Sequence, residues 1–420
     1  MKQLKILFIN AKKVITALSL LLVSATLFAQ SDSVYRIALI LPFQAQSTSE
    51  KLEIIANAHD LYTAQKIRLD GDALIGMDFY QGVLQSLREL NDSIKVELSV
   101  YDNWNKDSVT TELLKKDELK KQHVIIGSVS TSTGKLVAEF CKANKILNIQ
   151  PFSPSKSLTC NNAYHLKLAP TIDSHTDALF TSIVDSFAGA NVIIYTPNAE
   201  ISLSAATRFD SLFKDYNKTA TLKFTTALLN TSNMLLNGKK TTAIEQLKVN
   251  KTNVFIITSF EESFVNGNMR VLHDLREKYN LQVYGMPTWL NGDILRLDYI
   301  NDFNTRISDA YYVDSTRIET QTFINNYATN FNTDASKYSF LGYDVMNFTL
   351  HNLSNYGSHF LAQISTQRFK GTAYTFDISK VLNKPISTSI ATNADLLINY
   401  YENKFTNVYK VQDYQLKKVW

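Results

Sequence analysis

Short apolar runs alternate with amphipathic stretches along the first third of the chain. Continuous apolar runs are typical of parallel strands that are buried on both faces. Apolar residues that recur at steps of three and four indicate helices with one buried face. The predicted strands are residues 36–41, 96–102, 123–127 and 146–150, and the predicted helices are residues 77–90, 113–119 and 135–144. Such alternation predicts a parallel sheet covered by helices.

The same alternation restarts after Pro170. The predicted strands are residues 191–197, 222–224, 253–259 and 281–287, and the predicted helices are residues 174–187, 205–216, 243–248 and 272–279. Two later helical patterns, residues 320–331 and 338–356, are expected to return to the first half. A chain of 420 residues is also too long for one core. We therefore predict an α/β fold with two Rossmann-like lobes, in which residues 34–170 plus 314–372 form lobe 1 and residues 171–313 plus 373–420 form lobe 2. Residues 47–70 show no clear period and are expected to form a loop.

The first 29 residues have the layout of a secretory signal peptide. Four lysines precede an apolar run over residues 14–28, and polar residues follow from Gln30 onward. The run falls short of the roughly 20 apolar residues that span a bilayer, although an uncleaved anchor helix is the alternative. Cleavage is expected after Ala29, or after Ala25, so we predict export to the periplasm.

The charge balance argues against a nucleic-acid partner. Residues 1–29 hold four of the 43 Lys and Arg residues and none of the 39 Asp and Glu residues, so the remaining chain is balanced. The sequence also contains no H-E-x-x-H zinc motif and no G-x-S-x-G nucleophile motif. We therefore expect no enzyme, no metal and no cofactor.

The chain has two cysteines, Cys141 and Cys160. In an oxidising compartment they could form a disulfide that closes a loop of about 20 residues and contributes roughly 3 kcal/mol. The alternative is two buried free thiols. The sequence leaves both open, because a disulfide requires facing Cβ atoms.

Several segments occur in a characteristic order. They are RIALILPF, GMDFYQGVL, VYDN, IIGSVSTSTGKLVAEFCKANKILNIQPFSP, VYGMPTW and FLGYDVMNF. This set resembles type I periplasmic binding proteins, in particular the leucine/isoleucine/valine-binding branch and its relatives in Bacteroidetes. The resemblance implies two lobes joined by three chain crossings, near residues 169–171, 313–315 and 371–374, with a small ligand bound between them. It also implies an ABC permease or an envelope protein as partner.

The loop 127–134, GSVSTSTG, is the strongest candidate for ligand binding. Ligands of open α/β sheets bind at the carboxyl ends of the strands, and this loop follows a strand and opens a helix. Hydroxyls of Ser130, Thr131 and Ser132 and nearby N–H groups can converge on an anion at the positive helix end. The resemblance implies that the loop holds a ligand carboxylate, with Thr131 at the position of the first contacting serine. The alternative is a simple helix N-cap.

Other candidates follow other predicted strands. Phe43 and Trp289 offer aromatic walls, or else pack in the core or hinge. The acid that pairs with the ligand amine in the resembled family falls near Thr288 and is missing, which argues against a plain α-amino acid, because a buried ammonium needs an anionic partner. Glu261 or Glu262 could replace it. The full candidate set is Phe43, Ser130, Thr131, Ser132, Phe152, Ser153, Ser259, Phe260, Glu261, Thr288 and Trp289.

Two acids are expected to be structural. Asp102 ends a predicted strand and Asp344 lies near a helix start, positions at which carboxylates fix loops or cap helices. The sequence as a whole predicts an exported solute-binding protein for a small ligand, an amino acid or another carboxylate. The alternative is an envelope interaction or regulatory protein that keeps the fold without a role in transport.

Overall fold

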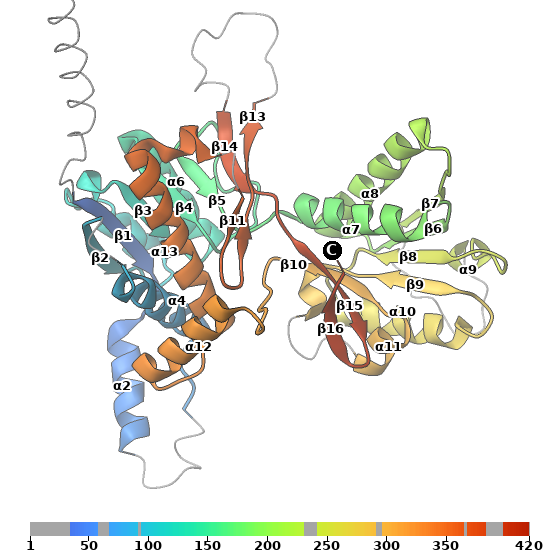
Figure 1. The fold of residues 1–420 in the computed structure, drawn as a ribbon, viewed down its shortest axis with the longest axis horizontal. Helices are drawn as coiled ribbons and strands as arrows, with labels where there is room; N and C mark the ends of the chain where they lie inside the picture. The colour runs from blue at the N-terminus through green and yellow to red at the C-terminus, as the bar shows by residue number, and fades with distance from the viewer. Residues whose placement is uncertain are drawn as a thin grey trace, which may run out of the picture.

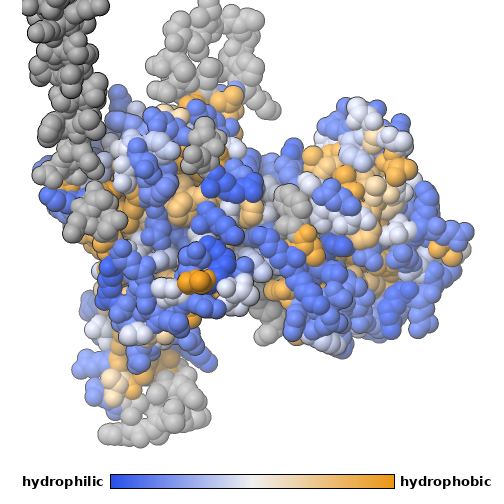
Figure 2. All heavy atoms as spheres, viewed as in Figure 1, coloured by the Kyte–Doolittle hydropathy of each residue, from blue (hydrophilic) through white to orange (hydrophobic). Residues whose placement is uncertain are grey.

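The computed structural model describes residues 34–57, 67–90, 94–230, 242–290, 296–364, 368–383 and 398–419. The predicted signal peptide lies outside the described residues. The described residues form two lobes, each built on a seven-stranded sheet (Figure 1). The surface of both lobes is largely hydrophilic on the face that Figure 2 shows. Within the described ranges, no helix is both long enough and apolar enough to span a membrane.

The sheet of lobe 1 has the strand order β13-β14-β5-β4-β3-β1-β2, and only the pair β13–β14 is antiparallel. The strands are β1 (Tyr35–Leu41), β2 (Val96–Asp102), β3 (Val124–Gly127), β4 (Leu147–Gln150), β5 (His165–Lys167), β13 (Ile378–Leu382) and β14 (Ile398–Asn403). The helices of this lobe are α2 (Ala45–Ala56), α4 (Gly71–Arg88), α5 (Asp107–Leu113), η1 (Leu119–Lys121), α6 (Thr131–Asn144), α12 (Ile318–Phe331), α13 (Lys337–Tyr356) and η3 (Gly357–Ala362). A small hairpin of β11 (Phe369–Lys370) and β12 (Thr375–Phe376) completes it.

The sheet of lobe 2 has the order β16-β15-β10-β9-β8-β6-β7. Its strands are β6 (Asn191–Thr196), β7 (Thr225–Asn230), β8 (Asn253–Ile257), β9 (Leu281–Tyr284), β10 (Arg306–Asp309), β15 (Asn407–Gln412) and β16 (Gln415–Lys418). The helices are α7 (Ile172–Phe187), α8 (Glu200–Thr219), α9 (Thr242–Glu245), α10 (Glu262–Leu275), η2 (Pro287–Leu290) and α11 (Leu297–Asp302). The strands β6 to β10 are parallel, whereas β15 and β16 are antiparallel additions at one edge.

The chain passes between the two sheets at three places: between β5 and α7, between β10 and α12, and between β14 and β15. The third differs from our expectation that residues 373–420 complete lobe 2. Strands β13 and β14 join the first sheet, so this crossing lies at residues 404–406 and only β15 and β16 extend the second sheet. A buried ion pair explains the placement of β14, because Lys167 Nζ lies 3.4 Å from Glu402 Oε2 and both side chains are almost fully buried.

Helices α4 and α13 pack so closely that their backbones touch. A Cβ atom on Gly342 would lie 2.0 Å from the carbonyl oxygen of Phe79, and one on Gly82 would lie 2.0 Å from that of Ser339. Neither position has room for a methyl group. The two glycines therefore set the helix spacing on this face of lobe 1.

We expect Gly342→Ala to destabilise the protein by about 1–3 kcal/mol, because overpacking forces the two helices apart. Urea-induced unfolding measures the change. Gly71→Ala is the matched control, since nothing lies within 4 Å of a Cβ built at Gly71, in the first turn of α4. An unfolding midpoint of Gly342→Ala equal to that of Gly71→Ala would contradict the close packing.

The two cysteines are free thiols. Cys141 lies on the buried face of α6, and Cys160 is exposed. Burial raises the pKa of the Cys141 thiol well above its usual range. The structure therefore shows two free thiols and not a disulfide, and only one of the two thiols is buried.

Candidate functional site

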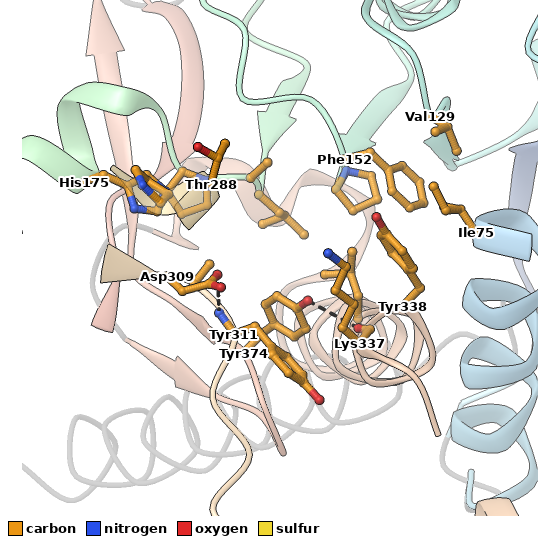
Figure 3. A pocket seen from close by; sticks show the side chains of 17 residues that line it. Ile75, Val129, Phe152, His175, Thr288, Asp309, Tyr311, Lys337, Tyr338 and Tyr374 are labelled. Carbon is orange, nitrogen blue, oxygen red and sulfur yellow. Dashed lines mark hydrogen bonds between the residues drawn. The ribbon is translucent and has the colours of Figure 1, made fainter. Parts of the chain in front are cut away.

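A cleft of about 300 Å³ lies between the lobes, at the low end of the range for small-molecule sites. Its walls come from both lobes and from the crossing segments (Figure 3). Val129 follows β3 and Phe152 follows β4, whereas Thr288 lies beyond β9 and Asp309 ends β10. The cleft is therefore placed at the carboxyl ends of the strands, where open α/β sheets bind ligands.

Gln150 at the end of β4 ties together the two candidate loops of lobe 1. Its side-chain oxygen accepts hydrogen bonds from the N–H groups of Phe152 (2.8 Å) and Ser153 (3.3 Å), and its amide donates to the carbonyl oxygen of Ser128 (2.7 Å). Because both loops are held by one side chain, the hydroxyls of Thr131 and Ser153 meet at 2.8 Å. Phe152 lines the cleft, whereas Thr131 and Ser153 are not part of its lining.

The other candidates of lobe 1 have structural contacts. Ser130 is the N-cap of α6 and accepts a hydrogen bond from the Thr133 N–H group at 3.3 Å, as the N-cap alternative predicted. The hydroxyl of Ser132 lies 3.2 Å from that of Ser130. The ring of Phe43 packs edge-on against Tyr80 at a centroid distance of 5.7 Å, outside the cleft lining.

In lobe 2 only one candidate lines the cleft. Thr288 lies in its wall, and the buried Thr288 Oγ1 has no hydrogen-bond partner among the residues that the structure describes. Trp289 is only 3% exposed and packs in the core of lobe 2, where its Nε1 donates to the carbonyl oxygen of Ser259 at 2.9 Å. Trp289 therefore packs in the core, as one of the two alternatives predicted, and does not form a wall of the cleft. Phe260 packs against the same core, and the Glu261 N–H group donates to Ser259 Oγ at 3.1 Å.

The cleft also contains charged groups that we did not predict. Asp309 approaches from lobe 2 and Lys337 from lobe 1, and Figure 3 shows both side chains at the cleft. Burial raises the pKa of Asp309, while the Tyr311 N–H group at 3.1 Å and the charge of Lys337 act in the opposite direction. Asp309 is the last residue of β10, so the search for side chains at strand ends would have selected it if residues 306–309 had been recognised as a strand.

His175 is a neutral polar group in the same wall. Its Nδ1 lies 3.0 Å from Ser308 Oγ, and burial lowers its pKa to about 4. At neutral pH the ring is therefore uncharged and offers a hydrogen-bonding nitrogen rather than a cation. It was not predicted, because it lies on α7 and not in a loop after a strand.

The second crossing segment and the β11–β12 hairpin of lobe 1 meet in the lining of the cleft. Tyr311 and Tyr374 form an antiparallel bridge, and their rings lie 5.5 Å apart. The Tyr374 hydroxyl donates to the carbonyl oxygen of Lys337 at 3.2 Å.

The expected structural role of Asp102 and Asp344 is confirmed. Asp102 accepts hydrogen bonds from the N–H groups of residues 43–45, and Asp344 accepts them from those of residues 372–374.

These features define a two-lobed α/β fold with a cleft at the ends of its strands. The chain has the fold of type I periplasmic binding proteins, and the resemblance seen in the sequence is confirmed at this level. One similar structure is a protein from Rhodospirillum rubrum assigned to branched-chain amino acid ABC transport, at 12% identity and TM-score 0.62, covering 92% of this chain and 100% of that one.

Two further structures agree with this fold. A branched-chain amino acid ABC transporter periplasmic ligand-binding protein from Burkholderia xenovorans has 10% identity and TM-score 0.58, over 92% of this chain and 94% of that one. An ABC transporter substrate-binding protein from Desulfitobacterium hafniense, in complex with Leu, has 12% identity and TM-score 0.53, over 92% and 100%. No protein-family model and no curated protein matches the chain.

Proposed function

We propose that this protein is an exported solute-binding protein, which captures one small ligand between its lobes and performs no chemistry on it. The observation that carries this proposal is the cleft itself, which polar and charged side chains of both lobes line together. A ligand that contacts both walls binds the closed form more tightly than the open form and so shifts the protein toward closure. The similar structures, which include substrate-binding proteins of ABC transporters, support the same role.

The charges of the cleft favour a ligand with both a cationic and an anionic group. Asp309 would take the cation and so supply the anionic partner that is missing at Thr288, and Lys337 would take the anion from the opposite lobe. The rings of Phe152 and Tyr338 provide an apolar surface in the lobe 1 wall of the same cleft. An amino acid or a related amino carboxylate meets all three requirements. The hydroxyls of Thr131 and Ser153 lie at the same edge of the sheet and would reach such a ligand on closure.

The compartment and partner follow from the same proposal. Cleavage of the predicted signal peptide would place the protein in the periplasm. An ABC permease would then receive the ligand, as the branched-chain amino acid and substrate-binding proteins of similar fold suggest.

A library of amino acids and other small carboxylates, screened by thermal shift, tests the proposal. We expect at least one compound to raise the melting temperature, because a ligand that binds only the native state stabilises it. Calorimetric titration of that compound should then give a Kd in the micromolar range, about −8 kcal/mol. A library without any stabilising compound would favour the alternative of an envelope interaction protein.

Variants at the two cleft charges sharpen this test. We expect Asp309→Asn and Lys337→Gln each to weaken binding of the identified compound about tenfold or more, because a charge-assisted hydrogen bond contributes roughly 1.5–3 kcal/mol. Asp334→Asn and Lys380→Gln change the same charges at exposed positions outside the cleft and should leave the affinity unchanged. Equal affinities for all four variants would remove Asp309 and Lys337 from the site.

A further inference from the structure

A second cavity lies at the hinge, separate from the ligand cleft. It has a volume of about 200 Å³ and shares none of its lining residues with the cleft. Its polar lining consists mainly of Tyr312, Asp314, Arg317, Lys370, Asn407 and Lys418. Three of these six side chains are cationic and one is anionic, so the cavity has a positive balance of charge.

The anionic group of this cavity is already engaged. The carboxylate of Asp314 accepts hydrogen bonds from the N–H group (3.1 Å) and the hydroxyl (2.6 Å) of Thr316. Arg317 is partly engaged as well, because it donates to the carbonyl oxygen of Gly371 at 2.7 Å and lies 3.6 Å from Glu319. These contacts leave the two lysines as the available cations.

Within the described part of the chain, neither Lys370 nor Lys418 forms an ion pair with a carboxylate, although the charge of Asp314 acts on both. Lys418 Nζ lies over the ring of Tyr312 at 5.3 Å and over that of Phe405 at 5.7 Å. Partial burial lowers the pKa of Lys418 and the positive charge of Lys370 lowers it further, while the charge of Asp314 acts in the opposite direction. A bound anion would relieve this repulsion.

The cavity has walls on both sides of the hinge. Lys370 belongs to the β11–β12 hairpin of lobe 1, whereas Asn407 and Lys418 belong to β15 and β16 of lobe 2. Between them runs the second crossing segment, held to the hairpin by the bond from the Tyr312 N–H group to the carbonyl oxygen of Ala373 at 2.9 Å. A group bound to both lysines would therefore join the two lobes directly.

We propose that this cavity binds a small oxyanion, a phosphate or carboxylate group, between Lys370 and Lys418 and thereby changes the angle between the lobes. The volume admits an anion of that size, and two lysines with one neighbouring arginine provide charge-assisted donors. Because the anion would contact both lobes, its affinity differs between open and closed forms. By linkage, the anion and the cleft ligand then alter the affinity for each other.

Titration with inorganic phosphate tests this proposal, with sodium chloride used to hold the ionic strength constant. We expect saturable binding of one phosphate per chain by calorimetry, weakened about tenfold or more in Lys370→Gln/Lys418→Gln. The matched control is Lys251→Gln/Lys380→Gln, which removes two exposed lysines outside the cavity and should bind phosphate as the unmodified protein does. Circular dichroism and melting temperature without phosphate verify that both double variants fold.

The same titration with acetate separates a carboxylate from a phosphate as the bound group. Absence of saturable binding for both anions, or an equal loss in the two double variants, would overturn the site. Small-angle scattering supplies the second readout, because a changed lobe angle changes the radius of gyration. Phosphate binding without such a change would overturn the coupling to the hinge. Asp309→Asn should leave phosphate binding intact. The proposed anion site and the proposed ligand cleft are therefore tested independently of each other.

Discussion

Replacement of Asp344 by alanine is expected to destabilise the protein by about 3–5 kcal/mol, because it breaks a buried hydrogen-bond network. The side chain is completely buried. Its carboxylate accepts hydrogen bonds from the N–H groups of Thr372 (2.7 Å), Ala373 (2.9 Å) and Tyr374 (2.8 Å), and from the Thr372 hydroxyl at 2.8 Å. Alanine would leave these donors buried without a partner, and each unsatisfied donor costs roughly 1–3 kcal/mol.

Urea-induced unfolding of Asp344→Ala measures this loss, and Asp334→Ala is its control. Asp334 is exposed, so its removal should change the unfolding free energy by less than about 0.5 kcal/mol. The backbone packs directly on the carboxylate, since a Cβ atom on Gly371 would lie 2.4 Å from Asp344 Cγ. A midpoint for Asp344→Ala within error of the control would disprove this role.

The same carboxylate connects lobe 1 to the hinge. Residues 372–374, which it holds, pair with the second crossing segment through Tyr311 and Tyr312. The segment therefore has a fixed position in the lining of the cleft. Asp344 is thus a structural acid, as expected from the sequence, but its partner lies 28–30 residues further along the chain, which periodicity could not indicate.

Most of the sheet architecture could be predicted because buried parallel strands have a distinct sequence signature. In β1 the side chains of Ile37, Leu39 and Leu41 enter one core cluster, and those of Ala38 and Ile40 enter the cluster on the other face. Both faces are covered by helices, so the whole strand reads as apolar. This is the pattern from which the alternation of strands and helices was recognised.

Strand β5 could not be predicted, because its sequence is polar. His165 and Lys167 are each about 1% exposed, and their partners come from other strands: Asn148 Oδ1 lies 2.7 Å from His165 Nδ1, and Glu402 pairs with Lys167. Polar residues become compatible with a buried strand only when such partners arrive from elsewhere in the chain. The misplacement of β13 and β14 has the same origin, since β14 pairs with β5.

The candidate site was predictable where it depended on loops after adjacent strands. Thr131 and Ser153 meet because β3 and β4 are neighbours in the sheet. Lys337 and His175 were missed because they lie on helices, and only the crossing of the chain brings these helices to the cleft. The sequence left the placement of Trp289 open, because an aromatic residue that follows a strand can either line a ligand site or pack in the core.

Acidification is expected to destabilise the protein through two buried histidines. Burial lowers the pKa of His165 to about 3, with a smaller effect of the Lys167 charge, and lowers the pKa of His175 to about 4. In the unfolded chain both titrate near the usual 6.5. Between these values the unfolded chain binds a proton at each histidine that the folded protein does not bind, so stability is fully present above about pH 6.5 and falls as the pH decreases toward 4.

Each of the two histidines contributes up to about 1.4 kcal/mol of lost stability per pH unit in this window. Urea unfolding at several pH values from 7 down to 4 measures the slope. The double variant His165→Gln/His175→Gln should show a shallower slope, because glutamine does not titrate. His351→Gln is the control, because His351 is exposed. The stability of this variant should depend on pH with the same slope as that of the unmodified protein. If the double variant lost stability with acid as steeply as this control, the buried histidines would not be the groups that titrate on unfolding.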